Sequence, residues 1–193
     1  MHTGQWITSP DGARWFFDSG SLALDFAYTG DYGYGVAEWE RLHDPSDLGA
    51  WLIDRFGPLA ADPNDVDLAA SLRLRAAISR IALNLADGQQ LAADDVDSIN
   101  DAALAPPPVP HLNRGTTLAS RTDVPAALSA IAREAIAVFS AGSERIRRCG
   151  ADDCAMVFYD TSRPGTRLWC SMRRCGNRTK VRTHRSRTQG GTQ

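Results

Sequence analysis

Residues 149–187 read CGADDCAMVFYDTSRPGTRLWCSMRRCGNRTKVRTHRSR and contain all four cysteines of the 193-residue chain. The cysteines form two CxxxxC pairs that are separated by fifteen residues. Two close thiolate pairs with this spacing can meet at one tetrahedral cation, so the pattern predicts one structural zinc ion held by Cys149, Cys154, Cys170 and Cys175. Because protein fills all four positions around the metal, the site argues against catalysis by the zinc.

Disulfides and an iron–sulfur cluster are the alternatives for a cysteine quartet. Disulfides belong to oxidising compartments, and Met1 to Pro10 has no charged segment followed by an apolar run, as a secretion signal would. Iron–sulfur sites commonly use tighter spacings in part of the motif. His184 is interpreted as a polar helix residue, because four thiolates already complete a zinc shell.

Two short runs of aromatic and β-branched residues lie between the cysteine pairs. Residues 156–159 and 167–169 are separated by the turn-forming segment 160–165. This pattern predicts a β-hairpin between the two pairs of ligands.

Gly176 and Asn177 are expected to cap a helix over residues 178–187. At 100° per residue, Arg178, Arg182 and Arg185 lie in one stripe on that helix. Together these elements predict a small four-cysteine zinc finger with a β-hairpin and a helix, in a treble-clef-like arrangement.

Helical signals fill the first three quarters of the chain. Apolar residues recur at helical spacing between start signals such as Asn64 and stop signals such as Gly88. Helices are expected over about 22–29, 48–56, 65–87, 96–104 and 125–141, and short strands at 14–17 and 116–119. The fold class is therefore α+β: a mostly α-helical N-terminal domain with a short β element, residues 1–142, followed by the finger, residues 143–193.

Charge is divided unevenly between these two parts. Residues 143–193 hold twelve basic and four acidic residues, a net charge of +8, whereas residues 1–142 have a net charge of −10. A basic segment on an acidic body indicates a polyanion-binding appendage, most often one for nucleic acid. The candidate contacts are Arg178, Lys180, Arg182, Arg185 and Arg187.

The segment from Cys149 to Arg187 resembles the CGNR zinc finger family, which is named for the residues that stand here as Cys175, Gly176, Asn177 and Arg178. Phe17-Asp18-Ser19-Gly20 and Leu24-Asp25-Phe26, followed by Thr29, resemble the ABATE domain that usually precedes this finger. The chain departs from that domain at Ala27-Tyr28, where the family usually has Val-Asn. The resemblance implies a bacterial, stress-induced transcription regulator whose finger binds DNA.

An arginine stripe on a short helix suits a major groove, where it can contact phosphates and guanine edges. Two rival functions remain open. Phe158, Tyr159 and Trp169 could stack unpaired bases of RNA, although a small finger also needs such residues for its own core. Alternatively, the basic finger could dock on an acidic protein surface, including its own N-terminal domain.

The N-terminal domain is expected to sense a small molecule or to form a homodimer. Trp15, Asp25, Tyr28 and Arg75 are the candidates for an effector pocket, with a purely structural carboxylate–arginine pair as the simpler interpretation. No nucleophile stands beside a convincing base, so the chain is not expected to be an enzyme. No apolar stretch approaches the length of a membrane helix, and a cytoplasmic protein is expected.

Overall fold

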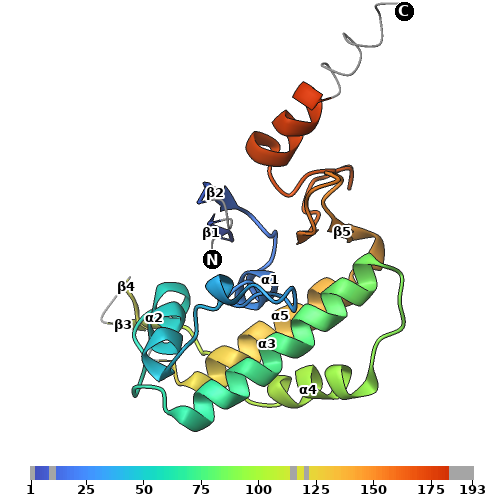
Figure 1. The fold of residues 1–193 in the computed structure, drawn as a ribbon. Coiled ribbons are helices and arrows are strands. Elements are labelled where there is room, and N and C mark those ends of the chain that lie inside the picture. Colours follow the sequence, from blue (N-terminus) through green and yellow to red (C-terminus); the bar gives the residue numbers. More distant parts are fainter. Residues whose placement is uncertain (1–2, 9–11, 114–116, 120–121, 183–193) are drawn as a thin grey trace, which may run out of the picture.

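The computed structural model describes residues 3–8, 12–113, 117–119 and 122–182 (Figure 1). Its α-helices are α1 (Leu22–Ala27), α2 (Pro45–Phe56), α3 (Asp65–Ala86), α4 (Ala93–Ala103) and α5 (Val124–Ser140). Its strands form three antiparallel pairs: β1 (Gln5–Thr8) with β2 (Arg14–Phe17), β3 (His111–Asn113) with β4 (Thr117–Ala119), and β5 (Ile146–Arg148) with β6 (Val157–Tyr159). The predicted fold class is confirmed: a helical domain with a small hairpin precedes a finger with a hairpin, a helix and a cluster of four cysteines.

Helix α3 forms where a local start signal agrees with the apolar spacing. Asn64 accepts hydrogen bonds from the N–H groups of Val66 and Asp67, and the Asp67 carboxylate accepts one from the N–H of Asn64. This reciprocal capping satisfies N–H groups that a helix start otherwise leaves without partners. The apolar face of α3 is buried through Leu74, Ala77, Ile78, Ile81 and Ala82.

The core of the helical domain is built around the short helix α1. This helix packs on both α3 and α5, and α4 contacts the same two helices (Figure 1). Leu24 and Phe26 of α1 are fully buried, as are Ile78 of α3 and Ile131 of α5. A six-residue helix is marginal on its own, so α1 depends on this packing.

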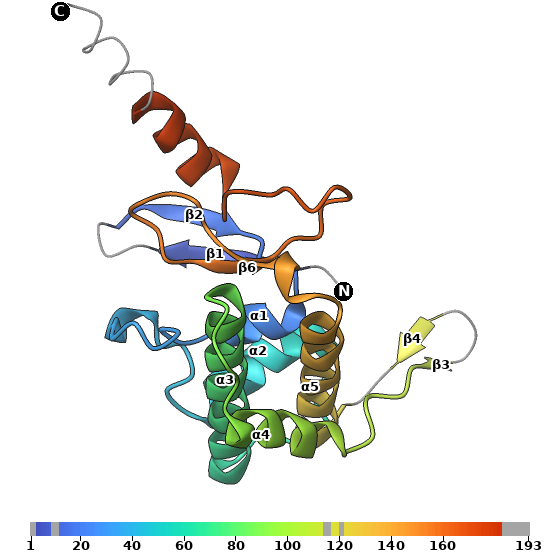
Figure 2. The ribbon, with the colours of Figure 1, turned by 90° about the vertical axis from the view of Figure 1, so that its right-hand side faces the viewer.

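The hairpin of β1 and β2 lies above α1, on the same side of the helical body as the finger (Figures 1 and 2). The predicted strand at 14–17 is β2. The predicted strand at 116–119 corresponds to β4, although Thr116 lies outside the described residues.

The hairpin predicted between residues 156–159 and 167–169 is wrong in its pairing. Strand β6 pairs with β5, which precedes the first cysteine, in the register Ile146 with Tyr159 and Arg148 with Val157. Residues 167–169 are not in a strand. The tight turn between Cys149 and Met156 brings β5 and β6 together directly, whereas residues 160–166 form a wider loop that Asp160 organises.

The C-terminal helix also begins earlier than the sequence predicts. Ser171 accepts a hydrogen bond from the N–H of Arg174 at the start of a π-helical turn, η3 (Met172–Gly176), and residues 177–182 continue as α-helix. Gly176 and Asn177 therefore lie inside the helix rather than at its cap. We call residues 172–182 the basic helix.

Candidate metal centre and basic surface

The Sγ atoms of the four cysteines all lie within 4.8 Å of one another. The Sγ atom of Cys170 is 3.6 Å from that of Cys154 and 3.5 Å from that of Cys175. A disulfide would need about 2.05 Å, whereas a tetrahedral zinc with Zn–S bonds of about 2.3 Å places its sulfurs about 3.8 Å apart. The four thiols fit one zinc ion, and they form the single zinc site of the finger.

Each pair of ligands is held by its own backbone turn. In the first turn, the N–H of Cys149 donates to the carbonyl of Met156 at 2.8 Å, and that of Cys154 donates to the carbonyl of Ala151 at 3.0 Å. In the second turn, the N–H of Cys175 donates to the carbonyl of Ser171 at 2.9 Å. Cys149, Cys170 and Cys175 are buried and Cys154 is half-buried, as expected for a structural metal site with no open position.

Arg178 faces the metal ligands from the basic helix. Its Nη2 lies 3.5 Å from the Sγ of Cys175, and its Nη1 lies 3.2 Å from a carboxylate oxygen of Asp153. A cation that donates to a zinc-bound thiolate stabilises the negative charge there and fixes the ligand's orientation. The side chain is still 42% exposed, so it also borders the solvent.

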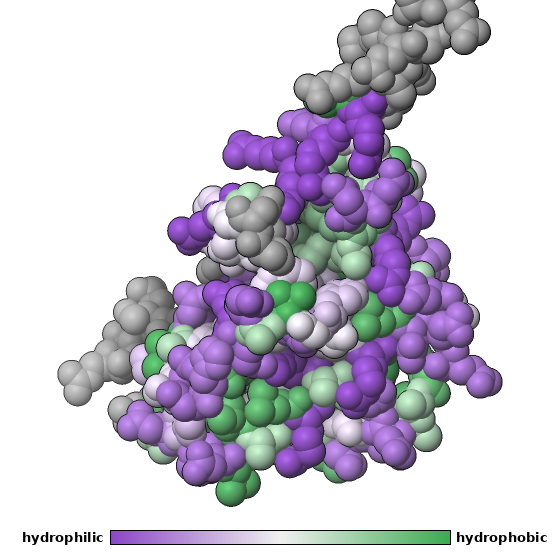
Figure 3. All heavy atoms as spheres, in the orientation of Figure 1, coloured by the Kyte–Doolittle hydropathy of each residue, from purple (hydrophilic) through white to green (hydrophobic). Residues whose placement is uncertain are grey.

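The other candidate nucleic-acid contacts occupy the exposed part of the basic helix. Lys180 is exposed, and Arg182 lies 3.3 Å from the carboxylate of Asp152, which is 86% exposed. Arg185 and Arg187, like His184, lie outside the described residues. Hydrophilic side chains cover this end of the molecule in the space-filling view (Figure 3).

Two arginines that the sequence analysis did not single out connect the finger to the helical domain. The guanidinium of Arg174 lies 3.7 Å from the centre of the Trp15 ring. Arg167 stacks on Phe158 at 4.2 Å, and its Nη2 donates to the carbonyls of Asp18 and Cys170. No local sequence pattern marks these arginines, because their partners are distant in the sequence or are backbone atoms.

The finger is packed against the helical domain rather than tethered to it. The Oη of Tyr28 accepts from the N–H of Val157 at 2.7 Å and donates to its carbonyl at 3.0 Å. The N–H of Tyr159 donates to the carbonyl of Ser19 at 2.8 Å. Buried residues of both parts belong to one continuous core.

An ion pair reinforces this junction at its edge. Arg148 of β5 makes a two-point contact with Asp87 at the end of α3, with Nη2 at 2.6 Å from one carboxylate oxygen. The hydrogen bond from Arg148 lowers the pKa of Asp87. Both side chains are about one-third exposed, so the pair adds little stability and mainly fixes orientation.

The four candidates for an effector pocket lie in different surroundings. Asp25 is fully buried and lies 3.9 Å from Arg55, Arg75 makes two hydrogen bonds to Glu40, and Trp15 lies under Arg174. Tyr28 borders a cavity together with Trp39, another aromatic residue expected to line a pocket, and with Arg41, which the sequence did not point to.

A helical domain that shares its core with a four-thiolate zinc finger defines the class of this protein: a zinc-finger protein with an exposed basic helix. Residues 20–142 match the ABATE family, described as a "putative stress-induced transcription regulator", and residues 145–188 match the CGNR zinc finger. Because the first match covers more than half of the chain, the protein belongs to the ABATE family. No protein with a curated description matches the chain.

The two matched families are a regulator domain and a zinc finger, and neither is a catalytic family. Among the helices that the structure describes, none has both the length and the apolar character needed to span a membrane.

Proposed function

We propose that this protein is a bacterial transcription regulator whose zinc finger binds duplex DNA. The observation that carries the proposal is the basic helix, which the zinc site holds at its first turn and which projects away from the helical body (Figures 1 and 2). A helix presented in this way can enter a major groove without moving the rest of the molecule.

The proposed contacts are Arg178, Lys180 and Arg182, continued in sequence by Arg185 and Arg187. Arg182 and Asp152 are both well exposed, and such surface ion pairs contribute about 0–1 kcal/mol. DNA phosphates can therefore replace Asp152 at little cost. Arg178 is the exception, since its bond to Cys175 gives it a structural role in the metal site as well.

RNA binding through stacked bases is a weaker candidate. Phe158 is fully buried under Arg167, and Tyr159 and Trp169 are half-buried in the core of the finger. Side chains that close the finger's own core offer less ring surface to an unpaired base than exposed aromatic residues would. An acidic protein surface is the third candidate partner. Competition between an acidic protein and labelled DNA for the finger distinguishes this partner from DNA.

We place the division between the two parts at residues 142 and 143, where Gly142 follows α5 with a φ of 126°. The N-terminal part is proposed to sense an effector or to dimerise. The reduced thiols that zinc requires suit the cytoplasm.

The test is a salt titration of the full zinc-loaded chain on a labelled DNA duplex, measured by fluorescence anisotropy. We expect affinity to fall steeply with salt, and Lys180→Gln and Arg182→Gln each to lower the slope of log K against log salt by about 1. Arg73→Gln removes an exposed arginine from α3 and should change nothing. Equal loss in all three variants, or preference for structured RNA or an acidic protein competitor, would contradict the proposal.

A further inference from the structure

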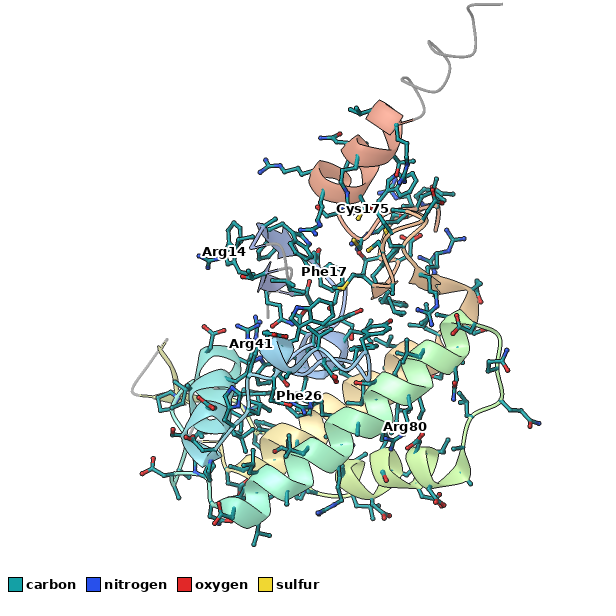
Figure 4. The ribbon with its side chains drawn as sticks, in the orientation of Figure 1. Arg14, Phe17, Phe26, Arg41, Arg80 and Cys175 are labelled. Carbon is teal, nitrogen blue, oxygen red and sulfur yellow. The ribbon has the colours of Figure 1, made fainter. Side chains whose placement is uncertain are left out.

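A cavity of about 360 Å³ opens where the β1–β2 hairpin, the loop before α2 and the finger meet. Its walls include Trp6 and Arg14 from the hairpin, Tyr28, Trp39 and Arg41 from the helical domain, and Met156 from the finger. Figure 4 shows Arg14 and Arg41 on the same side of the molecule, one on the hairpin and one on the loop beneath it. A cavity of this size accommodates a small organic molecule.

The aromatic walls are held in place by contacts of their own. The indole N–H of Trp39 donates to the carbonyl of Thr8 at 3.1 Å, which ties the loop to the end of β1. Tyr28 stacks on Tyr32 with ring centres 4.2 Å apart. Trp6 is 53% exposed and packs edge-on against Phe16. Preorganised indole and phenol rings favour a flat aromatic ligand.

The charges of the walls favour an anion. Arg14 stacks on Trp6 at 4.8 Å, and Arg41 donates to the amide oxygen of Gln5 at 2.7 Å. Within the described part of the chain, neither guanidinium has a carboxylate within 4.0 Å. The nearby Glu40 is engaged by two nitrogens of Arg75 instead.

The electrostatic surroundings of Arg41 are positive as well. Burial and the charge of Arg55 both lower the pKa of Arg41, because both disfavour its positive charge. A negatively charged ligand beside Arg41 would offset this effect and stabilise the cation. Glu38 also borders the cavity, so the walls hold two guanidinium groups and one carboxylate. This balance suits a ligand with a single negative charge.

We propose that this cavity binds a small aromatic monocarboxylate, with its ring between the indoles of Trp6 and Trp39 and its carboxylate on Arg14 and Arg41. Guanidinium groups bind carboxylates through two parallel hydrogen bonds, which gives direction as well as affinity. The rings supply apolar contact that a free inorganic anion could not use.

The occupied cavity would touch the zinc finger directly. Met156 forms part of the wall, and its carbonyl accepts the hydrogen bond from the N–H of the zinc ligand Cys149 at 2.8 Å. The Oη of Tyr28, another wall residue, holds both backbone groups of Val157. A bound ligand therefore rigidifies the turn that presents the first pair of metal ligands.

The binding test uses calorimetric titration of the full zinc-loaded chain with three probes that share one ring system: 2-naphthoate, 2-naphthamide and 2-naphthylmethylamine. We expect the carboxylate to bind at least about tenfold more tightly than the neutral amide and the amine to bind least. The double variant Arg14→Gln/Arg41→Gln should remove the preference for the carboxylate, while Arg73→Gln should keep it. Absence of binding, or equal affinity for carboxylate and amide in the unmodified chain, would overturn the proposal.

Hydrogen exchange tests the link to the finger without any DNA. Saturating 2-naphthoate should slow exchange of the amides of Cys149 and Val157 at least about threefold, and 2-naphthamide at the same concentration should not. If 2-naphthoate bound without slowing exchange at these amides, the cavity would still be a binding site, but the proposed effect of the ligand on the finger would be contradicted. Because neither measurement involves nucleic acid, failure here is separate from failure of the proposed DNA binding.

Discussion

Asp25 is a carboxylate buried at the centre of the helical domain. Its oxygens accept hydrogen bonds from the N–H of Gly4 at 2.6 Å and from the hydroxyl of Ser19 at 2.7 Å, and its nearest cation, Arg55, is 3.9 Å away. Burial raises the pKa of Asp25 to about 6, since the two hydrogen bonds and Arg55 only partly offset the loss of solvation. Asp25 thus holds β1 to α1 while being poorly stabilised as an ion.

This raised pKa predicts a loss of stability as the pH rises. Between about pH 4 and 7 the unfolded chain, with a carboxyl pKa near 3.8, has released the proton that the folded chain retains up to about pH 6. The free energy of unfolding should therefore fall by about 2–3 kcal/mol across this range, relative to the variant Asp25→Asn.

Urea unfolding of both proteins at several pH values measures the difference. Loss of zinc at low pH affects both proteins equally and cancels in the comparison. A difference that stays constant with pH would show that Asp25 ionises normally in the folded chain.

At Gly20 the backbone of the finger approaches the helical domain closely. Its φ is +80°, and a Cβ at this position would overlap the carbonyl oxygen of Tyr159. Replacement by alanine adds strain from the left-handed backbone to a clash with another backbone, so Gly20→Ala should lower the free energy of unfolding by about 3 kcal/mol.

Gly33→Ala is the matched control for Gly20→Ala, because Gly33 has a φ of +83° with no heavy atom within 4 Å of the added Cβ. It should cost about 1–2 kcal/mol through backbone strain alone. Urea unfolding measures both variants. If Gly20→Ala and Gly33→Ala lowered the free energy of unfolding equally, β6 would not pack against Gly20.

At the scale of elements, helix α1 is held at its start by another helix. Glu134 of α5 accepts hydrogen bonds from the hydroxyl of Ser21 and from the N–H groups of Leu22 and Ala23. A carboxylate at a helix N-terminus satisfies free N–H groups and complements the helix dipole.

Glu134→Gln should therefore lower the free energy of unfolding by about 1–2 kcal/mol, since the charge-assisted bonds become neutral ones. Thermal or urea unfolding measures the loss. Asp62→Asn, which neutralises an exposed carboxylate in the segment before α3, serves as the control for the change in net charge. A loss no larger than in that control would exclude the capping role.

Elements whose signals are local could be predicted from the sequence. Asn64 and its capping box mark the start of α3, and Ser21 marks that of α1. The zinc ligands could be predicted because the chain has only four cysteines, and their paired spacing fits one tetrahedral metal ion better than disulfides or an iron–sulfur cluster. The pairing of β6 was not, since residues 146–148 and 167–169 offer similar runs and the choice between them depends on the turn at the metal.

Tertiary partners explain the rest of what the sequence analysis missed. Ser171 caps the basic helix only because Cys170 and Cys175 are drawn to one metal. Arg174 and Arg167 belong to the basic segment 143–193, yet they join the finger to Trp15 and Asp18. Charge alone does not distinguish arginines that bind a partner from arginines that close an interface.

At the scale of the whole molecule, zinc organises only one end of a shared core. Removing it with a chelator should unfold the finger, because metal binding supplies on the order of 10 kcal/mol to modules of this size. Helices α3 and α5 should persist, since their buried faces pack on α1 and α4. Hydrogen exchange should show loss of protection from Ile146 onward and retention in α3.

Cys170→Ser should lower the zinc content and give the same exchange pattern without a chelator. Unchanged zinc content would contradict the assignment of this ligand, and collapse of α3 would show that the helical domain cannot stand without the finger.

The shared core also predicts that the finger is not an autonomous appendage. Val157 and Phe158 are fully buried, and the backbone groups of Val157 have Tyr28 as their partner. In a fragment of residues 143–193 these side chains would be exposed and the turn at Cys149 would lose its support. Since about 1.4 kcal/mol is a factor of ten in affinity, loss of one buried hydrogen-bonded contact should weaken zinc binding at least about tenfold relative to the full chain.

Competition with a chromophoric chelator measures the zinc affinity of both proteins. In the full chain, Tyr28→Phe should move the affinity towards that of the fragment, because it removes the hydroxyl that holds Val157 and leaves the ring in place. Equal affinity in the fragment and the full chain would mean that the finger folds on its zinc alone. The contacts between the finger and the helical domain would then orient the basic helix but would not stabilise the finger.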